Sequence, residues 1–251
     1  MRGLAALLWC LLCAPVAAEP LVIATTGTFP PYLWEEGDSV RGFDIDLMDE
    51  ICKRNGFECE YRIYPLTPGL EAVANGEADI ALGGIGITVE RQVYGYFTCP
   101  YTAGSTASVP IFARDRSVNL ATARIAVFAD SLSHQALIDE GYTAVPFDNL
   151  PDAIRSVLNG ETDAFHGNRN SLPLVPGAAD ALVPIAFIEG TGRGAGFLVS
   201  ADRPGLLATM NDSLAIFQRD GRLQQIADRW YGPGRFAPPD AGACSLGVAQ
   251  L

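Results

Sequence analysis

The feature that most constrains the fold is an alternation of short apolar strands with amphipathic helices, which occurs twice along the chain. In the first set, Phe43, Leu47 and Ile51 have the spacing of the buried face of a helix. Alternation of this kind is typical of an α/β fold whose sheets are covered by helices on both faces. The predicted strands cover residues 21–24, 60–64, 79–82, 125–128, 144–147, 163–166 and 197–200. The predicted helices cover residues 43–54, 69–75, 133–140, 150–158, 205–220 and 222–230.

A repeated phrase indicates that the two sets form two lobes. Asn-Gly-Glu-x-Asp occurs at 75–79 and again at 159–163, each time between a predicted helix and a predicted strand. Asn and Gly end helices well, since both tolerate a left-handed backbone conformation. A match of five residues also fits two unrelated but similar turns, so duplication is not established by it.

Composition excludes several classes of protein. There are 17 Lys and Arg against 29 Asp and Glu, which gives a formal net charge of −12. Binding to nucleic acid phosphates requires clustered basic residues, so we expect no nucleic acid partner. With 49% hydrophobic and 18% charged residues the chain is not disordered and contains enough apolar side chains for a core.

The first 18 residues have the pattern of a secretory signal peptide. A basic start at Arg2 precedes an apolar run, and Val16-Ala17-Ala18 supplies the small residues that signal peptidase requires. We expect cleavage before Glu19 and a periplasmic location. An uncleaved anchor is the alternative, although the run is short for a membrane span. Cys13 suggests lipid attachment less well, because Leu12 stands where a lipobox has a small residue.

Removal of this segment reduces the number of cysteines from six to four, because Cys10 and Cys13 belong to it. In an exported protein an even number of cysteines favours disulfides over metal ligation. We predict a bridge between Cys52 and Cys59, from the end of a helix to the next strand. Cys99 with Cys244 is a second possible bridge, which would fasten the C-terminal tail to the body.

Several segments, in order along nearly the whole mature chain, carry a family resemblance. They are GFDIDLMDEICKRNG at 42–56, NGEADIA at 75–81, GITVER at 86–91, YFTCPY at 96–101, and an ending from Asp220-Gly221 to Trp230-Tyr231-Gly232. Together they resemble the family 3 (polar amino acid type) periplasmic solute-binding proteins. The spacing of Cys52 and Cys59 also resembles the disulfide of basic amino acid binders in that family.

The resemblance implies a type II periplasmic-binding-protein fold, in which two α/β lobes close on a ligand by hinge motion. Residues 19–110 and 195–251 would form the first lobe, and residues 111–194 the second. The chain would cross between lobes near 109–112 and 185–196. The glycine-rich run at 190–196 lacks the GxxxxGK[ST] order of a phosphate-binding loop and is better explained as part of this hinge.

The same resemblance assigns a carboxylate site. Arg91 matches the family arginine that binds the ligand carboxylate through a guanidinium fork; the alternative is an ion pair with a surface acid near Glu90. Ser133 matches a second-lobe residue that meets the same carboxylate, or it is simply a helix N-cap. Gly84 and Gly86 stand where relatives often have hydroxyl residues, so only backbone groups remain there.

Other positions limit the identity of the ligand. Asn168 stands where amino acid binders have the acid that receives the ammonium group, and an amide has no charge to offer. Phe29 matches the aromatic that covers the ligand, with Trp34 nearby. Leu66 replaces a second aromatic, and Thr26 stands where basic amino acid binders often have an acid, which makes a lysine-like ligand less favoured.

An enzyme is the main alternative, because some relatives of this fold are cyclohexadienyl dehydratases that use a carboxylate in the cleft. The matching segment here, 166–170, contains no acid. His134 and His166 are the two histidines, and there is no HExxH, GxSxG or SxxK motif. We therefore expect a non-enzymatic, monomeric binding protein with no cofactor or metal, which hands a small carboxylate to an ABC importer. A solute sensor is the third possibility.

Overall fold

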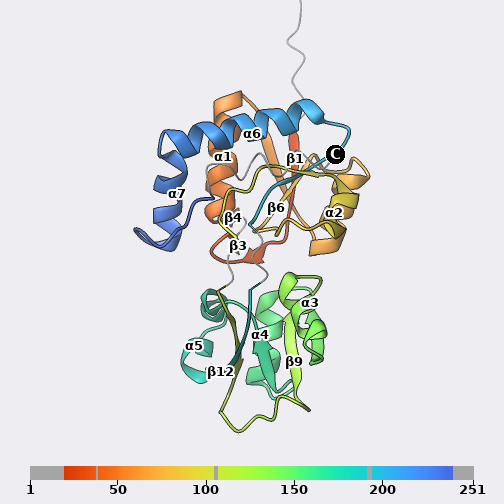
Figure 1. The fold of residues 1–251 in the computed structure, drawn as a ribbon, viewed down its shortest axis with the longest axis vertical. Coiled ribbons are helices and arrows are strands. Elements are labelled where there is room, and N and C mark those ends of the chain that lie inside the picture. Colours follow the sequence, from red (N-terminus) through yellow and green to blue (C-terminus); the bar gives the residue numbers. More distant parts are fainter. Residues whose placement is uncertain (1–19, 38, 105–106, 191–193, 240–251) are drawn as a thin grey trace, which may run out of the picture.

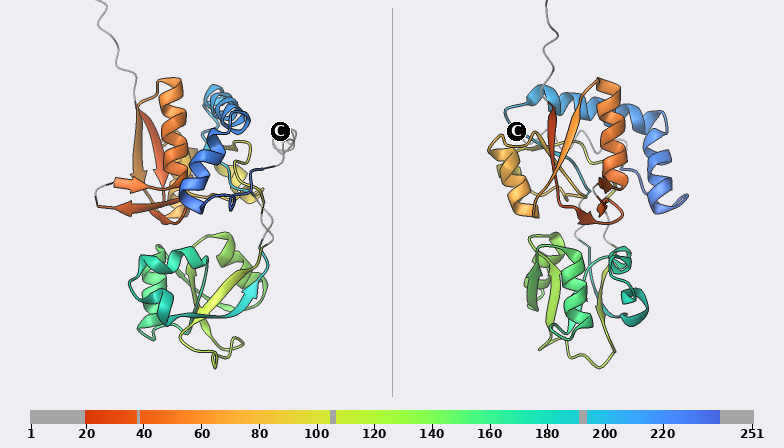
Figure 2. Two further views of the ribbon diagram at one scale, coloured as in Figure 1. Left: turned by 90° about the vertical axis from the view of Figure 1, so that its left-hand side faces the viewer. Right: turned by 180° about the vertical axis from the view of Figure 1, so that it is seen from behind.

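The computed structural model describes residues 20–37, 39–104, 107–190 and 194–239. Two lobes lie one above the other in Figure 1, and both views in Figure 2 show the same separation. Each lobe contains a five-stranded sheet. The α/β, two-lobed fold that the sequence predicts is therefore confirmed. Within the described residues, no helix is both long and apolar enough to span a membrane.

The sheet of the first lobe has the order β5-β1-β6-β13-β7. Its strands are β1 (Leu21–Thr25), β5 (Cys59–Ile63), β6 (Ile80–Leu82), β7 (Tyr96–Phe97) and β13 (Leu198–Val199). Helices α1 (Phe43–Asn55), α6 (Pro204–Arg219) and α7 (Arg222–Tyr231) share one apolar core with the sheet, and α2 (Leu66–Ala74) lies on the opposite face. Neighbouring residues of β1 serve the two faces, since Ile23 joins the first core and Ala24 the second. A small sheet of β2 (Thr28–Phe29), β3 (Leu33–Glu36) and β4 (Ser39–Arg41) completes the lobe.

The sheet of the second lobe has the order β10-β9-β11-β8-β12. Its strands are β8 (Val109–Ala113), β9 (Arg124–Phe128), β10 (Thr143–Phe147), β11 (Ala164–His166) and β12 (Val183–Ile188). Helix α3 (Leu132–Asp139) covers one face, and α4 (Leu150–Leu158), α5 (Ala178–Ala181) and the 3-10 helix η2 (Arg169–Leu174) cover the other. Both sheets have three parallel strands followed by two antiparallel ones, so the lobes share one topology.

The repeated Asn-Gly-Glu-x-Asp phrase has the same structure in both lobes. Gly76 and Gly160 adopt φ angles of 75° and 76°, which favour glycine, directly after α2 and α4. The side-chain oxygens of Asp79 and Asp163 each accept a backbone N–H, from β1 and β9 respectively, at 2.8 Å. The phrase therefore fastens each central strand to its neighbour.

Part of each predicted crossing segment belongs to the second sheet. All five residues of β8 pair within the second sheet, so the segment 109–112 is not a crossing strand. The strand is next to the edge of the sheet, and burial of Ile111 and Phe112 holds it there. The first crossing therefore precedes Val109. The predicted lobe boundaries stay a prediction, and residues 191–193 of the glycine-rich run lie outside the described residues.

The predicted disulfide between Cys52 and Cys59 is present and joins the last turns of α1 to the start of β5. Cys244 lies outside the described residues, so its pairing with Cys99 stays a prediction. Cys99 itself is 9% exposed, and its backbone N–H donates to Asn211.

Candidate functional site

The two lobes meet around Arg91, which belongs to the 3-10 helix η1 (Glu90–Tyr94) of the first lobe. Its Nη1 donates to the carbonyl of Gly86 at 3.0 Å, and its Nη2 donates to the carbonyl of Asp130 in the second lobe, also at 3.0 Å. Burial lowers the pKa of the guanidinium, while the charges of Asp130 and Glu90 act in the opposite direction. Both of these hydrogen bonds go to backbone carbonyls, and the alternative of a surface pair near Glu90 stays open.

A small cavity of about 90 Å³, which we call the arginine chamber, lies beside this guanidinium. Phe29, Gly84, Gly86, Arg91 and Ser133 all line it, so the structure brings together five of the six predicted ligand residues. Its lining also includes Leu66, Phe128, Ser131 and Leu132. The Phe29 ring is stacked between Tyr32 and Phe128, with ring centroids 5.7 and 5.9 Å away, and so covers the chamber with a fixed aromatic surface.

The glycine loop of the first lobe is held from behind by a buried acid. One oxygen of Asp44 accepts the N–H groups of Gly83 and Gly84, at 2.9 and 2.8 Å, and the hydroxyl of Tyr101 at 2.7 Å. The N–H of Gly84 is thus engaged, and this residue contributes to the chamber through its carbonyl and its lack of a side chain. Burial raises the pKa of Asp44 to about 7, although these three hydrogen bonds lower it.

The structure explains why glycine replaces the hydroxyl residues that relatives have in this loop. A Cβ atom on Gly86 would lie 2.5 Å from Cδ1 of Leu132, and one on Gly84 would lie 2.6 Å from the Tyr32 ring. Gly84 also has a φ angle of 64°. Leu132 of the second lobe therefore fills the space over Gly86, a pairing that sequence reasoning missed.

The second lobe contributes the start of α3. Ser131 is the N-cap, and its side chain accepts the N–H of His134 at 3.1 Å. The alternative that Ser133 caps the helix is therefore wrong. Its backbone N–H lies in the first turn, where helices have donors without intrahelical partners, and such groups suit an anion. An N-cap serine accepts the N–H of the residue two or three positions later, and Ser131 stands three positions before His134, so the sequence did contain a signal for this cap.

Asp130 connects the lobes directly. Besides receiving Arg91 on its carbonyl, it accepts a hydrogen bond from the Thr67 hydroxyl of α2 at 2.7 Å on its carboxylate. Its φ angle of 56° is the only positive value among the described non-glycine residues. The backbone conformation that aims the carbonyl at Arg91 is thus one that few side chains adopt. Sequence reasoning missed this residue, since a single Asp before a helix is common.

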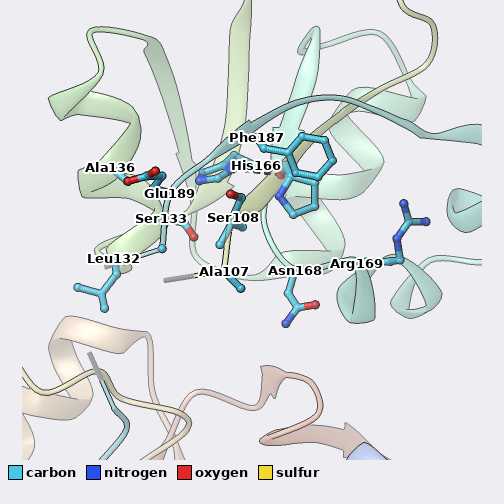
Figure 3. A pocket seen from close by; sticks show the side chains of 13 residues that line it. Ala107, Ser108, Leu132, Ser133, Ala136, His166, Asn168, Arg169, Phe187 and Glu189 are labelled. Carbon is cyan, nitrogen blue, oxygen red and sulfur yellow. Dashed lines mark hydrogen bonds between the residues drawn. The ribbon is translucent and has the colours of Figure 1, made fainter. Parts of the chain in front are cut away.

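Asn168 lies outside the arginine chamber. It caps η2, where its side-chain oxygen accepts the N–H of Asn170 at 3.0 Å, so its NH₂ group is what it can offer a ligand. Together with Ser133 it lines a larger cavity of about 520 Å³ on the second lobe, which we call the second-lobe groove (Figure 3). Leu132 and Ser133 line both cavities.

The remaining predicted positions lie around these cavities. Trp34 packs edge-on against Trp230, with centroids 5.1 Å apart, and lines neither cavity. Thr26 lines a third cavity of about 420 Å³ between the lobes, the outer cavity, together with Glu35 and Asp148. No described cluster of three or more His, Cys, Asp or Glu side chains has the arrangement of a metal site.

His166 is buried at the end of β11 and forms a hydrogen bond between Nδ1 and the carbonyl of Pro110 at 3.1 Å. Since a carbonyl can only accept, Nδ1 carries the proton and Nε2 is an acceptor. Burial lowers the pKa of His166, which keeps the ring neutral.

Comparison with known proteins identifies the family. The model of the bacterial extracellular solute-binding proteins, family 3, matches residues 21–233. The chain belongs to this family. Among individual relatives, this solute-binding protein is 28% identical to the ABC transporter arginine-binding protein 1 of Escherichia coli (strain K12), over 91% of this chain and 97% of the relative.

Solved structures agree with the fold. A periplasmic His/Glu/Gln/Arg/opine family-binding protein from Silicibacter pomeroyi, in complex with lysine, superposes with a TM-score of 0.77 at 25% identity, covering 86% of this chain and 98% of that one. An ancestral amino acid-binding protein, a precursor of cyclohexadienyl dehydratase, superposes with a TM-score of 0.71 at 24% identity, covering 84% and 95%. The second likeness shows the fold alone.

Proposed function

We propose that this solute-binding protein captures a small carboxylate-bearing solute, an amino acid or a close relative of one, between its lobes and delivers it to an ABC importer. The observation that carries the proposal is the half-buried guanidinium of Arg91, which lies at the meeting point of the lobes and donates to backbone carbonyls of both. Removal of residues 1–18 as a signal peptide would place the mature chain in the periplasm.

Arg91 has donors to spare for a ligand. A guanidinium has five N–H bonds, and the structure engages two terminal nitrogens with one carbonyl each. The remaining donors and the backbone N–H of Ser133 would receive the two oxygens of a carboxylate, as charge-assisted hydrogen bonds. Phe29 would cover the ligand, Gly84 and Gly86 would leave room for it, and the NH₂ group of Asn168 would meet an acceptor of the ligand.

A dehydratase role has less support from the site. At the segment that matches the acid of the dehydratases, the groove has a neutral His166 that is hydrogen-bonded to Pro110 and an amide at Asn168, so neither is placed as a strong acid. The carboxylate of Glu189, directly after β12, also lines the groove. Binding without chemistry therefore remains our proposal. The arginine-binding relative makes L-arginine the first solute to test.

The experiment is a thermal-shift screen of the mature protein against amino acids, opines, betaines, hydroxy acids and dicarboxylates, followed by calorimetric titration of each hit. A ligand that binds only the native state raises the melting temperature. Arg91→Gln should weaken binding by about a hundredfold or more, because loss of a charge-assisted fork costs about 3 kcal/mol. Arg91→Lys should have an affinity between those of wild type and Arg91→Gln, since it keeps the charge and loses the fork.

Arg54→Gln is the matched control, because this arginine lies exposed in the last turn of α1, away from the cleft. It should bind as the wild type does. If Arg91→Gln binds the hit as tightly as wild type, the carboxylate role of Arg91 is wrong and the proposed function loses its basis.

A further inference from the structure

The second-lobe groove lies beside the start of α3 and is bordered by strands β8 and β12 of the second sheet. It is lined by Ser108, Ser133, Ala136, His166, Phe187 and Glu189, among others. Figure 3 shows Glu189 on the α3 side, near Ala136 and Ser133, with Asn168 at the end closer to the first lobe.

The charge that the groove presents to a ligand is negative. Glu189 has no hydrogen bond or ion pair within the described residues. Arg169 also lines the groove, but its guanidinium lies over the Phe112 ring, 5.3 Å from the centroid, and Figure 3 shows it pointing away from the other labelled side chains. A carboxylate is thus the charged group that faces into the groove.

The uncharged lining also suits a cation. Nε2 of His166 is an acceptor, because Nδ1 donates to Pro110, and the hydroxyls of Ser108 and Ser133 can accept as well. Phe187 is 62% exposed, an unusual state for a large apolar ring in a cavity wall. An aromatic face beside a carboxylate is a favourable environment for an ammonium or guanidinium group.

The dimensions determine where the rest of a ligand must go. At about 90 Å³, the arginine chamber is well below the usual range for small-molecule sites of about 300–1,000 Å³, whereas the groove lies within it. The chamber and the groove share Leu132 and Ser133, while the outer cavity shares no lining residue with the chamber. A ligand held by Arg91 therefore extends past Ser133 into the groove.

We infer that the second-lobe groove receives the cationic end of an elongated carboxylate ligand, and that Glu189 selects for this cation. The inference rests on the proposed function, since Arg91 holds the opposite end. It also explains how the protein functions with a neutral Asn168: the positive charge of the ligand lies at its far end rather than next to its carboxylate. The ligand class is a carboxylate with a guanidinium or ammonium group several bonds away.

Two probes of equal length isolate this charge. The guanidinium of 5-guanidinopentanoate is replaced in 5-ureidopentanoate by a neutral urea of nearly the same shape, and neither has an α-amino group. By calorimetric titration, wild type should bind the guanidino probe about tenfold more tightly. Glu189→Gln should bring the two affinities to within about twofold while leaving the affinity for the ureido probe unchanged, because an exposed charge pair contributes modestly. Glu140→Gln removes the same charge from an exposed position at the end of α3 and should keep the wild-type preference.

The possible failures are distinguishable. If Glu189→Gln prefers the guanidino probe as strongly as wild type does, the role of Glu189 is wrong. The role is also wrong if wild type binds another carboxylate but binds neither probe. Loss of both probes in Arg91→Gln is expected. Undiminished binding of both probes by Arg91→Gln would instead overturn the proposed function on which the inference rests.

Discussion

The two lobes share one topology, yet they support the cleft with buried groups of opposite character. In the first lobe, Asp44 accepts the N–H groups of the Gly83-Gly84 loop. In the second lobe, His166 donates to the carbonyl of Pro110 at the start of the sheet's fourth strand. The side chain in each lobe matches the backbone group that needs a partner: an acceptor for exposed N–H groups, a donor for a carbonyl. Burial then disfavours the charged form of both, which gives the lobes opposite dependence on pH.

The largest expected effect concerns Asp44. Its pKa is about 7 in the folded protein and near 3.8 in the unfolded chain, so the folded state binds the proton more tightly. The stability associated with this proton is fully present below about pH 4 and is lost as the pH rises to about 7. Three pKa units correspond to about 4 kcal/mol, and we expect a loss of about 2–4 kcal/mol. Asp44→Asn, which cannot ionise, should remove this part of the pH dependence.

Urea denaturation of wild type and Asp44→Asn at pH 5 and pH 8 measures the difference. Asp212→Asn, an exposed aspartate of α6, should follow wild type at both values. Parallel stability changes in wild type and Asp44→Asn would show that Asp44 is charged in the fold throughout this range, and the contrast between the lobes would fail.

The second prediction concerns the contact between Gly86 of the first lobe and Leu132 of the second. Gly86→Ser should overpack this contact and disfavour the arrangement of lobes seen here by about 1–3 kcal/mol. Small-angle scattering of the ligand-free protein should show a larger radius of gyration for Gly86→Ser than for wild type. Adding Leu132→Ala should restore the wild-type value, since it removes the obstructing atoms.

An unchanged radius in Gly86→Ser would mean that the two residues do not limit how the lobes approach. If the double variant has the same enlarged radius of gyration as Gly86→Ser, Leu132 is not the residue that the new side chain meets. Gly205→Ser is the control, because Gly205 has open space around it and no positive φ angle. Gly76→Ser is unsuitable, because the φ angle of Gly76 is 75°.

The third and smallest effect concerns His166. Burial lowers its pKa below the ordinary 6.5, so the unfolded chain binds the proton more tightly than the folded protein does. This group has no effect on stability above about pH 7, and it destabilises the fold as the pH falls below 6.5. The sign is opposite to that of Asp44.

His166→Asn keeps a donor for Pro110 and cannot gain a proton in this range, so it should lose this destabilisation. Denaturation of wild type and His166→Asn at pH 7.5 and 5.5 measures it. An equal acid-induced loss in wild type and His166→Asn would contradict the assignment.

Most of the framework could be predicted from the sequence, because the decisive signals are local. The spacing of Phe43, Leu47 and Ile51 determines which face of α1 is buried, and Gly76 and Gly160 end their helices by backbone conformation alone. The strands at β8 and β12 were assigned to the hinge because their pairing joins residues about 70 positions apart, which no local pattern records.

The site divides in the same way. By itself the sequence indicated Arg91, Phe29 and Ser133 through the family motifs in which they stand, and the structure places all three at one chamber. The positions of Leu132, Asp130 and Glu189 at the site were decided by the tertiary structure alone. Each depends on which atoms of the other lobe or of a distant strand lie within a few ångströms, and that distance is set by how the two lobes pack and not by any neighbour in the chain.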